Sequence, residues 1–147
     1  KKAIFCDSEI VFFFLMKREV FTMSQHYKEA NEIKYNAYCP YSHFHVGCVL
    51  EMKDGTLIKG VNVENTAYGS TLCAERNAML HSITKGYKKG DIKSITITSD
   101  SDEPTYPCGD CRQVMLELCH SYTPVYMTDK TGQKSIKCTI DQLIPTF

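Results

Sequence analysis

The chain has 147 residues, a length that predicts a single domain with its own hydrophobic core. Seventeen Lys and Arg residues balance 17 Asp and Glu residues, so the chain lacks the net positive charge with which proteins hold a nucleic-acid backbone. This balance favours a small, weakly charged ligand and argues against a nucleic-acid partner.

The cysteine content bears on the cellular compartment. Eight cysteines would suggest a disulfide framework in a secreted protein, but the chain is longer than typical disulfide scaffolds. Three of the cysteines also fit a metal-binding pattern, so we expect a reducing, cytoplasmic compartment. The other five are expected to be buried or surface thiols, because free cysteine packs as a small hydrophobic residue: Cys6, Cys39, Cys48, Cys119 and Cys138.

The only dense apolar run, Ile10 to Met16, lies near the N-terminus. Its seven residues are far fewer than the roughly 20 that a membrane-spanning helix needs. Asp7 and Glu9 precede the run and no A-x-A-like cleavage site follows it, which argues against a signal peptide. We therefore expect neither secretion nor a membrane segment.

The first predicted elements are a helix and a β-hairpin. Thr22-x-x-Gln25 is a capping box, and apolar residues then recur at helical spacing until Pro40, at Tyr27, Ala30, Ile33 or Lys34, and Ala37. From Phe44 to Met52 the sequence alternates, with every second residue on one apolar face. Residues 53–56 predict a turn into a second strand over 57–63.

Strands and helices alternate in the rest of the chain. We expect a helix over about 72–86, with Ala74, Ala78, Met79 and Ile83 buried, and a central strand over 94–99. A third helix begins at Cys108, with Val114, Met115 and Leu118 pointing inward. Strands over 124–128 and 135–139 then precede a short helix near 141–144. This order predicts an α/β fold, with a mixed sheet of about five strands and helices on both faces.

Three cysteines form a metal-binding pattern. Cys108 and Cys111 have the C-x-x-C spacing that lets two sulfur atoms bind one ion from a single turn, and Cys73 can add a third thiolate from another helix start. Three protein ligands leave one position open for water, which is typical of catalytic zinc. The alternative is a structural zinc site completed by a histidine, but none of the five histidines has ligand spacing to these cysteines.

Two charged residues, Glu75 and Arg76, lie two and three positions after Cys73 in the same predicted helical turn. A lone Glu75 would be an ordinary first-turn glutamate that stabilises its helix N-terminus. Next to metal ligands, it is a candidate general acid and base facing the metal-bound water. Three thiolates on Zn²⁺ carry a net charge of −1, which would weaken the pull of the ion on its bound water. Arg76 taken alone is a solvated helix residue.

Four motifs resemble, in sequence order, the small oligomeric zinc-dependent cytidine deaminases of pyrimidine salvage. They are Tyr38-Cys39-Pro40-Tyr41-Ser42-His43-Phe44-His45-Val46-Gly47, Asn62-Val63-Glu64-Asn65, Cys73-Ala74-Glu75-Arg76 and Pro107-Cys108-Gly109-Asp110-Cys111-Arg112-Gln113. The resemblance runs from about Ser24 to the C-terminus. It implies a deaminase domain over 23–147 and an N-terminal extension, leader or upstream sequence over 1–22.

The resemblance also implies a fold, a reaction and an assembly. The family has a three-layer α/β/α sandwich, one Zn²⁺ per subunit and a homotetrameric assembly with pockets shared between subunits. Its members hydrolyse cytidine and deoxycytidine to uridine and deoxyuridine, releasing ammonia. The implied zinc ligands are Cys73, Cys108 and Cys111. Glu75 takes the proton of the attacking water, passes it to ring atom N3 and then protonates the leaving amine.

The remaining site residues also come from the resemblance. Asn62 and Glu64 alternate with valines, so their side chains leave the strand end on one face, and the matching residues bind the ribose 3′-hydroxyl. The other matches are Phe44 on the pyrimidine, the Ala74 N–H to the O2 carbonyl, Arg76 to the zinc-bound sulfurs, and Tyr68 and Phe147 in a neighbouring subunit's pocket. The tail that ends at Phe147 has one intervening residue after Pro145, where the family has two.

Two rival functions remain at this point. One is a deaminase of the same fold acting on another aminopyrimidine or a nucleoside antibiotic, which the Asn62 to Asn65 motif disfavours. The other is a zinc-stabilised binding module without catalysis, which Glu75 and the missing fourth ligand disfavour.

Overall fold

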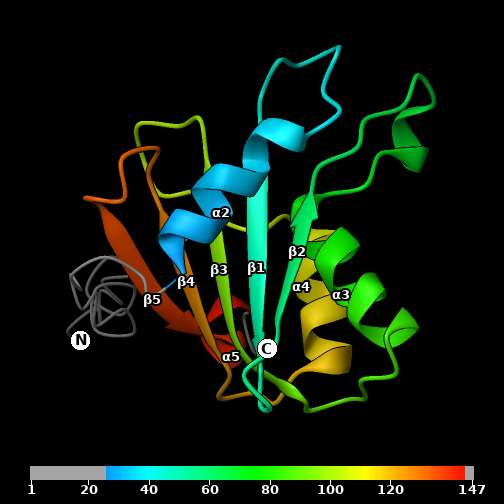
Figure 1. Ribbon diagram of the computed structural model, residues 1–147, viewed down its shortest axis with the longest axis vertical. Helices are drawn as coiled ribbons and strands as arrows, with labels where there is room; N and C mark the ends of the chain where they lie inside the picture. Colours follow the sequence, from blue (N-terminus) through cyan, green and yellow to red (C-terminus); the bar gives the residue numbers. More distant parts are fainter. Residues whose placement is uncertain (1–25, 145–147) are drawn as a thin grey trace, which may run out of the picture.

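A single mixed β-sheet forms the centre of the computed structural model, which describes residues 26–144 (Figure 1). The strands are β1 (Val46–Met52), β2 (Leu57–Val61), β3 (Ile92–Ser99), β4 (Pro124–Thr128) and β5 (Ser135–Thr139). Their order across the sheet is β2-β1-β3-β4-β5, with β3 and β4 parallel and the other neighbouring pairs antiparallel. The predicted mixed sheet of about five strands is confirmed.

Helices cover both faces of this sheet and give the predicted three-layer sandwich. Helix α2 (Tyr27–Ile33) continues into a 3₁₀ turn, η1 (Lys34–Asn36), and crosses one face over β1 and β3. Helices α3 (Ala74–Thr84) and α4 (Gly109–Leu118) pack side by side on the other face (Figure 1). A short 3₁₀ turn, η2 (Tyr68–Ser70), lies in the loop before α3, and α5 (Ile140–Leu143) follows β5.

Two glycines let the helices approach the sheet closely. A Cβ atom on Gly47 would lie 2.1 Å from the carbonyl oxygen of Ala30 in α2. A Cβ atom on Gly60 would lie 2.4 Å from the carbonyl oxygen of Ala74 in α3. Gly60 pairs with Cys48, the neighbour of Gly47, and adjacent strand residues face opposite sides. Gly47 therefore allows α2 to approach one face of the sheet, and Gly60 allows α3 to approach the other face.

The central position of β1 changes the predicted burial pattern. The sequence predicts alternation from Phe44, whereas β1 begins at Val46 and six of its seven residues are buried. Helices cover both faces of β1, so side chains on either face are shielded, as happens in fully covered strands. Phe44 lies before the strand and is 37% exposed.

The predicted helices are present, but with corrections to their ends and burial. The capping box of Thr22 and Gln25 lies outside the described residues, and α2 ends at Ile33 with Lys34 as its buried neighbour. The prediction that Ile83 is buried is wrong, because it lines a surface groove between α3 and α4. Ser82 is buried instead, and its hydroxyl donates to the Met79 carbonyl oxygen.

The described cysteines outside the metal pattern are buried, in agreement with the expectation for small hydrophobic residues: Cys39, Cys48, Cys119 and Cys138. Cys6 lies outside residues 26–144. Within this part of the chain, no helix combines the length and the apolar character that crossing a bilayer requires.

Candidate active site

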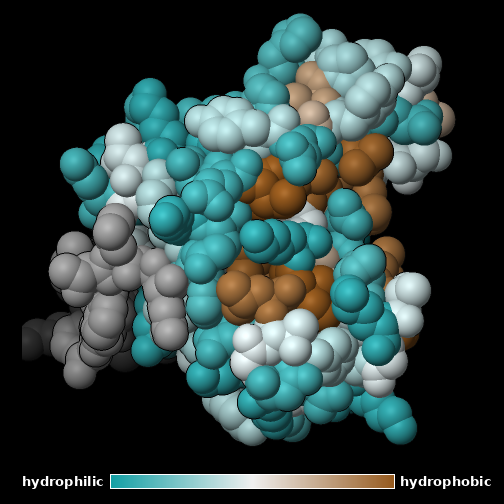
Figure 2. Space-filling view, in the orientation of Figure 1, coloured by the Kyte–Doolittle hydropathy of each residue, from teal (hydrophilic) through white to brown (hydrophobic). Residues whose placement is uncertain are grey.

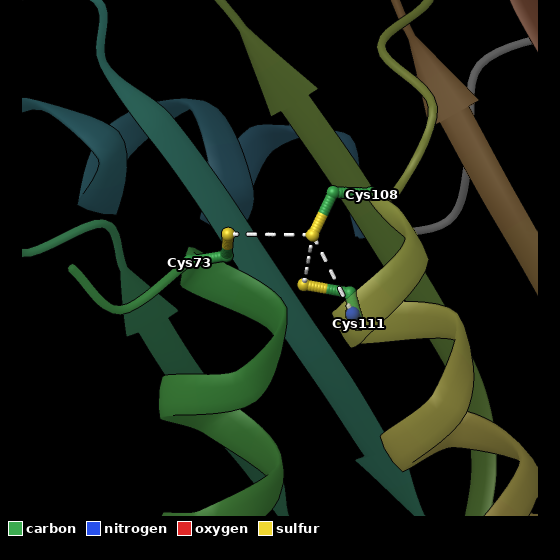
Figure 3. Close-up of side chains that lie close together, drawn as sticks. All are labelled: Cys73, Cys108 and Cys111. Carbon is green, nitrogen blue, oxygen red and sulfur yellow. Dashed lines mark hydrogen bonds between the residues drawn. The ribbon is translucent and has the colours of Figure 1, made fainter. Parts of the chain in front are cut away.

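The N-terminal ends of α3 and α4 bring three cysteines together (Figure 3). Cys73 is the N-cap residue of α3, Cys108 is the N-cap residue of α4, and Cys111 lies in the first turn of α4. The Sγ atoms of Cys73 and Cys108 are 3.7 Å apart, and those of Cys108 and Cys111 are 3.4 Å apart. All three sulfur atoms lie within 4.8 Å of one another.

This sulfur triangle fits a zinc ion. Tetrahedral zinc with Zn–S bonds of about 2.3 Å places its sulfur ligands about 3.8 Å apart, close to the distances in the triangle. The N-caps of α3 and α4 also place two sulfurs at the positive ends of helix dipoles, which favour thiolates. In the described residues, this group is the only cluster of metal-ligating side chains.

Neighbouring donors favour the thiolate form of Cys73. The Cys111 thiol hydrogen-bonds to Cys73 and, together with Arg76, lowers the pKa of Cys73 to about 5, although burial opposes this shift. The Arg76 Nη2 atom lies 3.6 Å from the Cys73 Sγ atom and also donates to the Thr71 carbonyl oxygen at 3.2 Å. Arg76 therefore contacts the Cys73 sulfur, and its role toward zinc-bound sulfurs stays a prediction.

Glu75 is buried beside the sulfur triangle. It is the second residue of α3, and only 4% of its surface is exposed. Desolvation raises the pKa of the Glu75 carboxyl to about 7, because burial disfavours its charged form. A carboxyl that gains and loses a proton near neutral pH suits general acid and base catalysis.

A cavity of about 240 Å³ opens onto Glu75, Cys73 and Cys108. The predicted residues in its wall are Asn62, Glu64, Cys73, Ala74, Glu75 and Cys108. Sequence reasoning assigned no role there to five further lining residues: Ser42, Val46, Thr71, Thr105 and Tyr106. Ser42 and Val46 belong to the motif around Phe44, which was a usable signal, whereas nothing in the sequence marks Thr71 or Thr105.

Asn62 and Glu64 line the cavity and also organise the loop before β1. The Asn62 amide donates to the Phe44 carbonyl oxygen at 2.8 Å and accepts from the Val46 N–H at 2.9 Å. A Glu64 carboxylate oxygen accepts from the Ser42 hydroxyl at 2.7 Å. Their proposed ribose contacts would therefore come from groups already fixed by protein hydrogen bonds.

Two predicted substrate residues lie outside the cavity wall, and a third lies outside the described residues. Phe44 lies two residues before Val46 in the chain, but its side chain is not part of the lining. Tyr68 lies in η2 and is 93% exposed. Phe147 lies outside the described residues. The roles of these three residues remain predictions.

The fold and the site together define a zinc-dependent hydrolase: three cysteines would hold one zinc ion, and two of them line a cavity together with the buried carboxyl group of Glu75. Residues 22–127 match the family model described as the cytidine and deoxycytidylate deaminase zinc-binding region. The chain belongs to this family.

Named relatives agree with this assignment. The chain is 44% identical over 118 residues to a cytidine deaminase of Halalkalibacterium halodurans, covering 80% of this chain and 87% of that protein. It is 39% identical to a cytidine deaminase of Sporosarcina psychrophila, with coverages of 80% and 84%. The crystal structure of cytidine deaminase from Burkholderia pseudomallei matches with a TM-score of 0.80 and 37% identity, covering 84% of this chain and 98% of that chain.

Proposed function

We propose that the protein hydrolyses cytidine and deoxycytidine to uridine and deoxyuridine with release of ammonia, as a zinc enzyme of pyrimidine salvage in the cytoplasm. The observation that carries this proposal is the buried Glu75 carboxyl, which lines the same cavity as Cys73 and Cys108. The relatives named cytidine deaminase support the choice of nucleoside.

The chain's own residues manage the proton transfers of this reaction. Cys73, Cys108 and Cys111 would hold the zinc ion, which supplies the Lewis acidity that makes water a nucleophile near neutral pH. Glu75 accepts the proton of the attacking water as C4 of the ring is attacked. It delivers this proton to N3. It then takes the second proton from the hydroxyl group now on C4 and delivers it to the exocyclic nitrogen, so that the C4–N bond breaks and ammonia leaves. A carboxyl with a pKa of about 7 can serve in both directions.

Groups around the cavity would orient the nucleoside. Ala74 is the first residue of α3, where backbone N–H groups have no partner within the helix, so its N–H can donate to the O2 carbonyl. Asn62 and Glu64 line the cavity and would bind the ribose hydroxyls. Phe44 would pack against the pyrimidine ring from the loop before β1.

Ammonia release tests the function directly. Purified zinc-loaded protein should release one ammonia per uridine formed from cytidine, and a chelator that removes zinc should abolish the reaction. Readdition of zinc should restore it. Absence of cytidine turnover in the zinc-loaded protein would overturn the proposal, and faster turnover of cytidine monophosphate than of cytidine would overturn the choice of a nucleoside.

We also propose a homotetramer in which Tyr68 enters a neighbouring pocket. Large apolar side chains are exposed on the loops around the cavity, among them Tyr38, Tyr41, Val63 and Tyr68. Figure 2 shows hydrophobic surface gathered into patches on an otherwise hydrophilic face. Such patches commonly mark contacts between proteins, which supports an oligomer.

The deaminase domain is proposed to occupy residues 23–147, which is supported by the start of the family match at residue 22. A variant that begins at Met23 should therefore assemble and release ammonia from cytidine at the rate of the full chain. Loss of soluble protein on this truncation would show that the preceding residues pack on the domain.

A further inference from the structure

Val46 lines the cavity, and the backbone that leads into it is held by side chains rather than by strand pairing. Val46 is the first residue of β1, and its pairing partner in β3 is Ser99, the last residue of that strand. Before this pair, the backbone of Phe44 and His45 has no partner in the β1–β3 ladder. Unpaired backbone groups near a site must find other partners to stay fixed.

Asp100 supplies such a partner from the residue after β3. One of its carboxylate oxygens accepts from the His45 backbone N–H at 3.0 Å and from the His45 ring Nδ1 atom at 2.7 Å. Asn62 bonds the flanking Phe44 carbonyl and Val46 N–H from the other side. The side chains of Asp100 and Asn62 thus fix backbone groups of three successive residues, 44 to 46.

A buried lysine fixes Asp100 in turn. The Lys34 side chain, between the α2 layer and the sheet, is 2% exposed. Its Nζ atom lies 3.3 Å from the second carboxylate oxygen of Asp100 and donates to the Ser99 carbonyl oxygen at 3.1 Å. Desolvation opposes the charge on Asp100, but the hydrogen bonds from His45 and Lys34 outweigh it and lower the pKa of this carboxyl. The carboxylate is therefore charged near neutral pH.

We propose that Asp100 is a positioning residue for the nucleoside. Its hydrogen bonds fix His45, the residue just before the β1–β3 pairing begins, and thereby hold Val46 in the cavity wall. Lys34 orients the Asp100 carboxylate. Neither residue lines the cavity, and neither takes part in the proton transfers. This inference rests on the proposed function, since it concerns how the same cavity binds its substrate.

Loss of the Asp100 carboxylate should weaken nucleoside binding and leave the rate of the chemical step nearly unchanged. The wall at Val46 contacts the substrate in both the ground state and the transition state, so displacing it raises KM with kcat nearly unchanged. The metal ligands lie on α3 and α4, on the other face of the sheet, and should remain in place. A defect confined to folding would change neither parameter of the folded fraction in this way.

The test compares Lys34→Met with the double variant Lys34→Met/Asp100→Ala. Both lack the buried cation, so the comparison avoids leaving a lone buried charge, which by itself destabilises proteins strongly. We expect KM for cytidine to be about tenfold higher in the double variant than in Lys34→Met, because a hydrogen-bonded carboxylate is lost. Zinc content should be equal, and kcat should agree within about threefold.

Product binding and a histidine variant complete the test. Uridine binding measured by calorimetry should weaken by the same factor, and His45→Ala, which keeps the backbone N–H, should remain near the parent. A KM and a uridine affinity equal to those of the parent in the double variant would overturn the positioning role. If the lysine variants do not fold, Asp100→Asn serves instead, and parental KM and uridine affinity there would overturn it. Failure of the parent to deaminate cytidine would instead refute the proposed function.

Discussion

At the scale of single residues, the environment of Glu75 decides its chemistry. A glutamate in the first turn of a solvated helix is charged at neutral pH and stabilises the helix dipole. Here the side chain is buried, and desolvation raises its pKa to about 7. The same residue type at the same helix position thus becomes a proton donor and acceptor, since its two protonation states have similar free energies near neutral pH.

Glu75→Gln should keep zinc and fold but lose the reaction. Glutamine has nearly the same shape, so α3 and the three thiolates should be undisturbed, but it has no basic oxygen to take the water proton. One positioned proton transfer contributes about 10²–10⁴-fold, and Glu75 acts in several, so we expect a loss at or above the upper end. Zinc content, thermal unfolding and turnover of the purified variant measure this. Stoichiometric zinc with activity within about tenfold of the parent would remove Glu75 as the proton carrier.

The site residues differ in how far sequence could predict them. Cys73, Cys108 and Cys111 were predictable because metal ligation restricts residue type and spacing. The contacts of Asp100 with His45 and Lys34 were not, because they join residues 55 and 66 positions apart in the chain and depend on where β1 and β3 stop pairing. Side-chain contacts of this kind follow from strand register, which local sequence patterns do not specify.

At the scale of elements, the close approach of α3 to β2 connects the sheet to the site. Gly60 faces the backbone of Ala74 and Ala78, and Ala74 lies between Cys73 and Glu75. The distance between α3 and β2 thus determines how far from the sheet Cys73, a predicted zinc ligand, and the Glu75 carboxyl lie.

Gly60→Ala should therefore destabilise the protein and disturb the site together. The added methyl group would lie 2.4 Å from the Ala74 carbonyl oxygen and 2.5 Å from the Ala78 nitrogen, both backbone atoms that cannot rotate away. Overpacking of this kind costs about 1–3 kcal/mol. Denaturant unfolding and zinc affinity measure the two effects. Gly69→Ala is the matched control, since its added methyl group would meet no atom within 4 Å, and it should leave both unchanged.

The hydrogen bonds of Glu51 to neighbouring elements make the stability of the protein depend on pH. Glu51 in β1 accepts from Lys93 in β3 at 2.7 Å and from the Ser94 hydroxyl at 3.2 Å, and it also contacts His26 before α2 at 3.2 Å. The hydrogen bond from Lys93 is the main cause that lowers the pKa of the Glu51 carboxyl below its ordinary value of 4.5. Its stabilisation is present above that value and is lost as the pH falls through the lower pKa of the folded state.

Glu51→Gln should therefore lower the free energy of unfolding at pH 7 by about 1–3 kcal/mol, the range for hydrogen bonds to charged groups. The difference from the parent should shrink as the pH is lowered below about 4. Urea unfolding at several pH values measures it. Glu103→Gln breaks an exposed pair with Lys134 and should change stability little at any pH. A difference that grows on acidification would contradict the assignment.

Sequence patterns predicted which elements exist better than which faces they bury. The strands and helices followed from periodicity, but Ile83 is exposed and Ser82 is buried. The packing of α4 beside α3 explains this, because it leaves Ile83 at a groove between the helices. A helix pattern gives the direction of an apolar stripe, whereas its neighbours decide how much of the stripe is covered.

At the scale of the whole molecule, the position of Tyr68 makes the oligomer part of the catalytic hypothesis. Tyr68 is 93% exposed and lies outside the wall of its own chain's cavity. The neighbouring loops expose further apolar side chains, and a group of exposed apolar side chains commonly marks a contact between proteins. If Tyr68 completes a neighbour's pocket, an isolated subunit should be nearly inactive.

Mixed oligomers test this arrangement directly. Tyr68→Ala should fold normally because its side chain packs against little within one chain, but it should lose activity, while Tyr122→Ala, another exposed tyrosine, should not. Glu75→Gln is expected to be inactive for a different reason. When the Tyr68→Ala and Glu75→Gln chains are coexpressed, some pockets combine an intact Glu75 from one chain with an intact Tyr68 from the other, and activity should return. Light scattering on the same samples should show an oligomer. No recovery in confirmed mixed oligomers, or full activity in a monomer, would show that each chain carries a complete pocket.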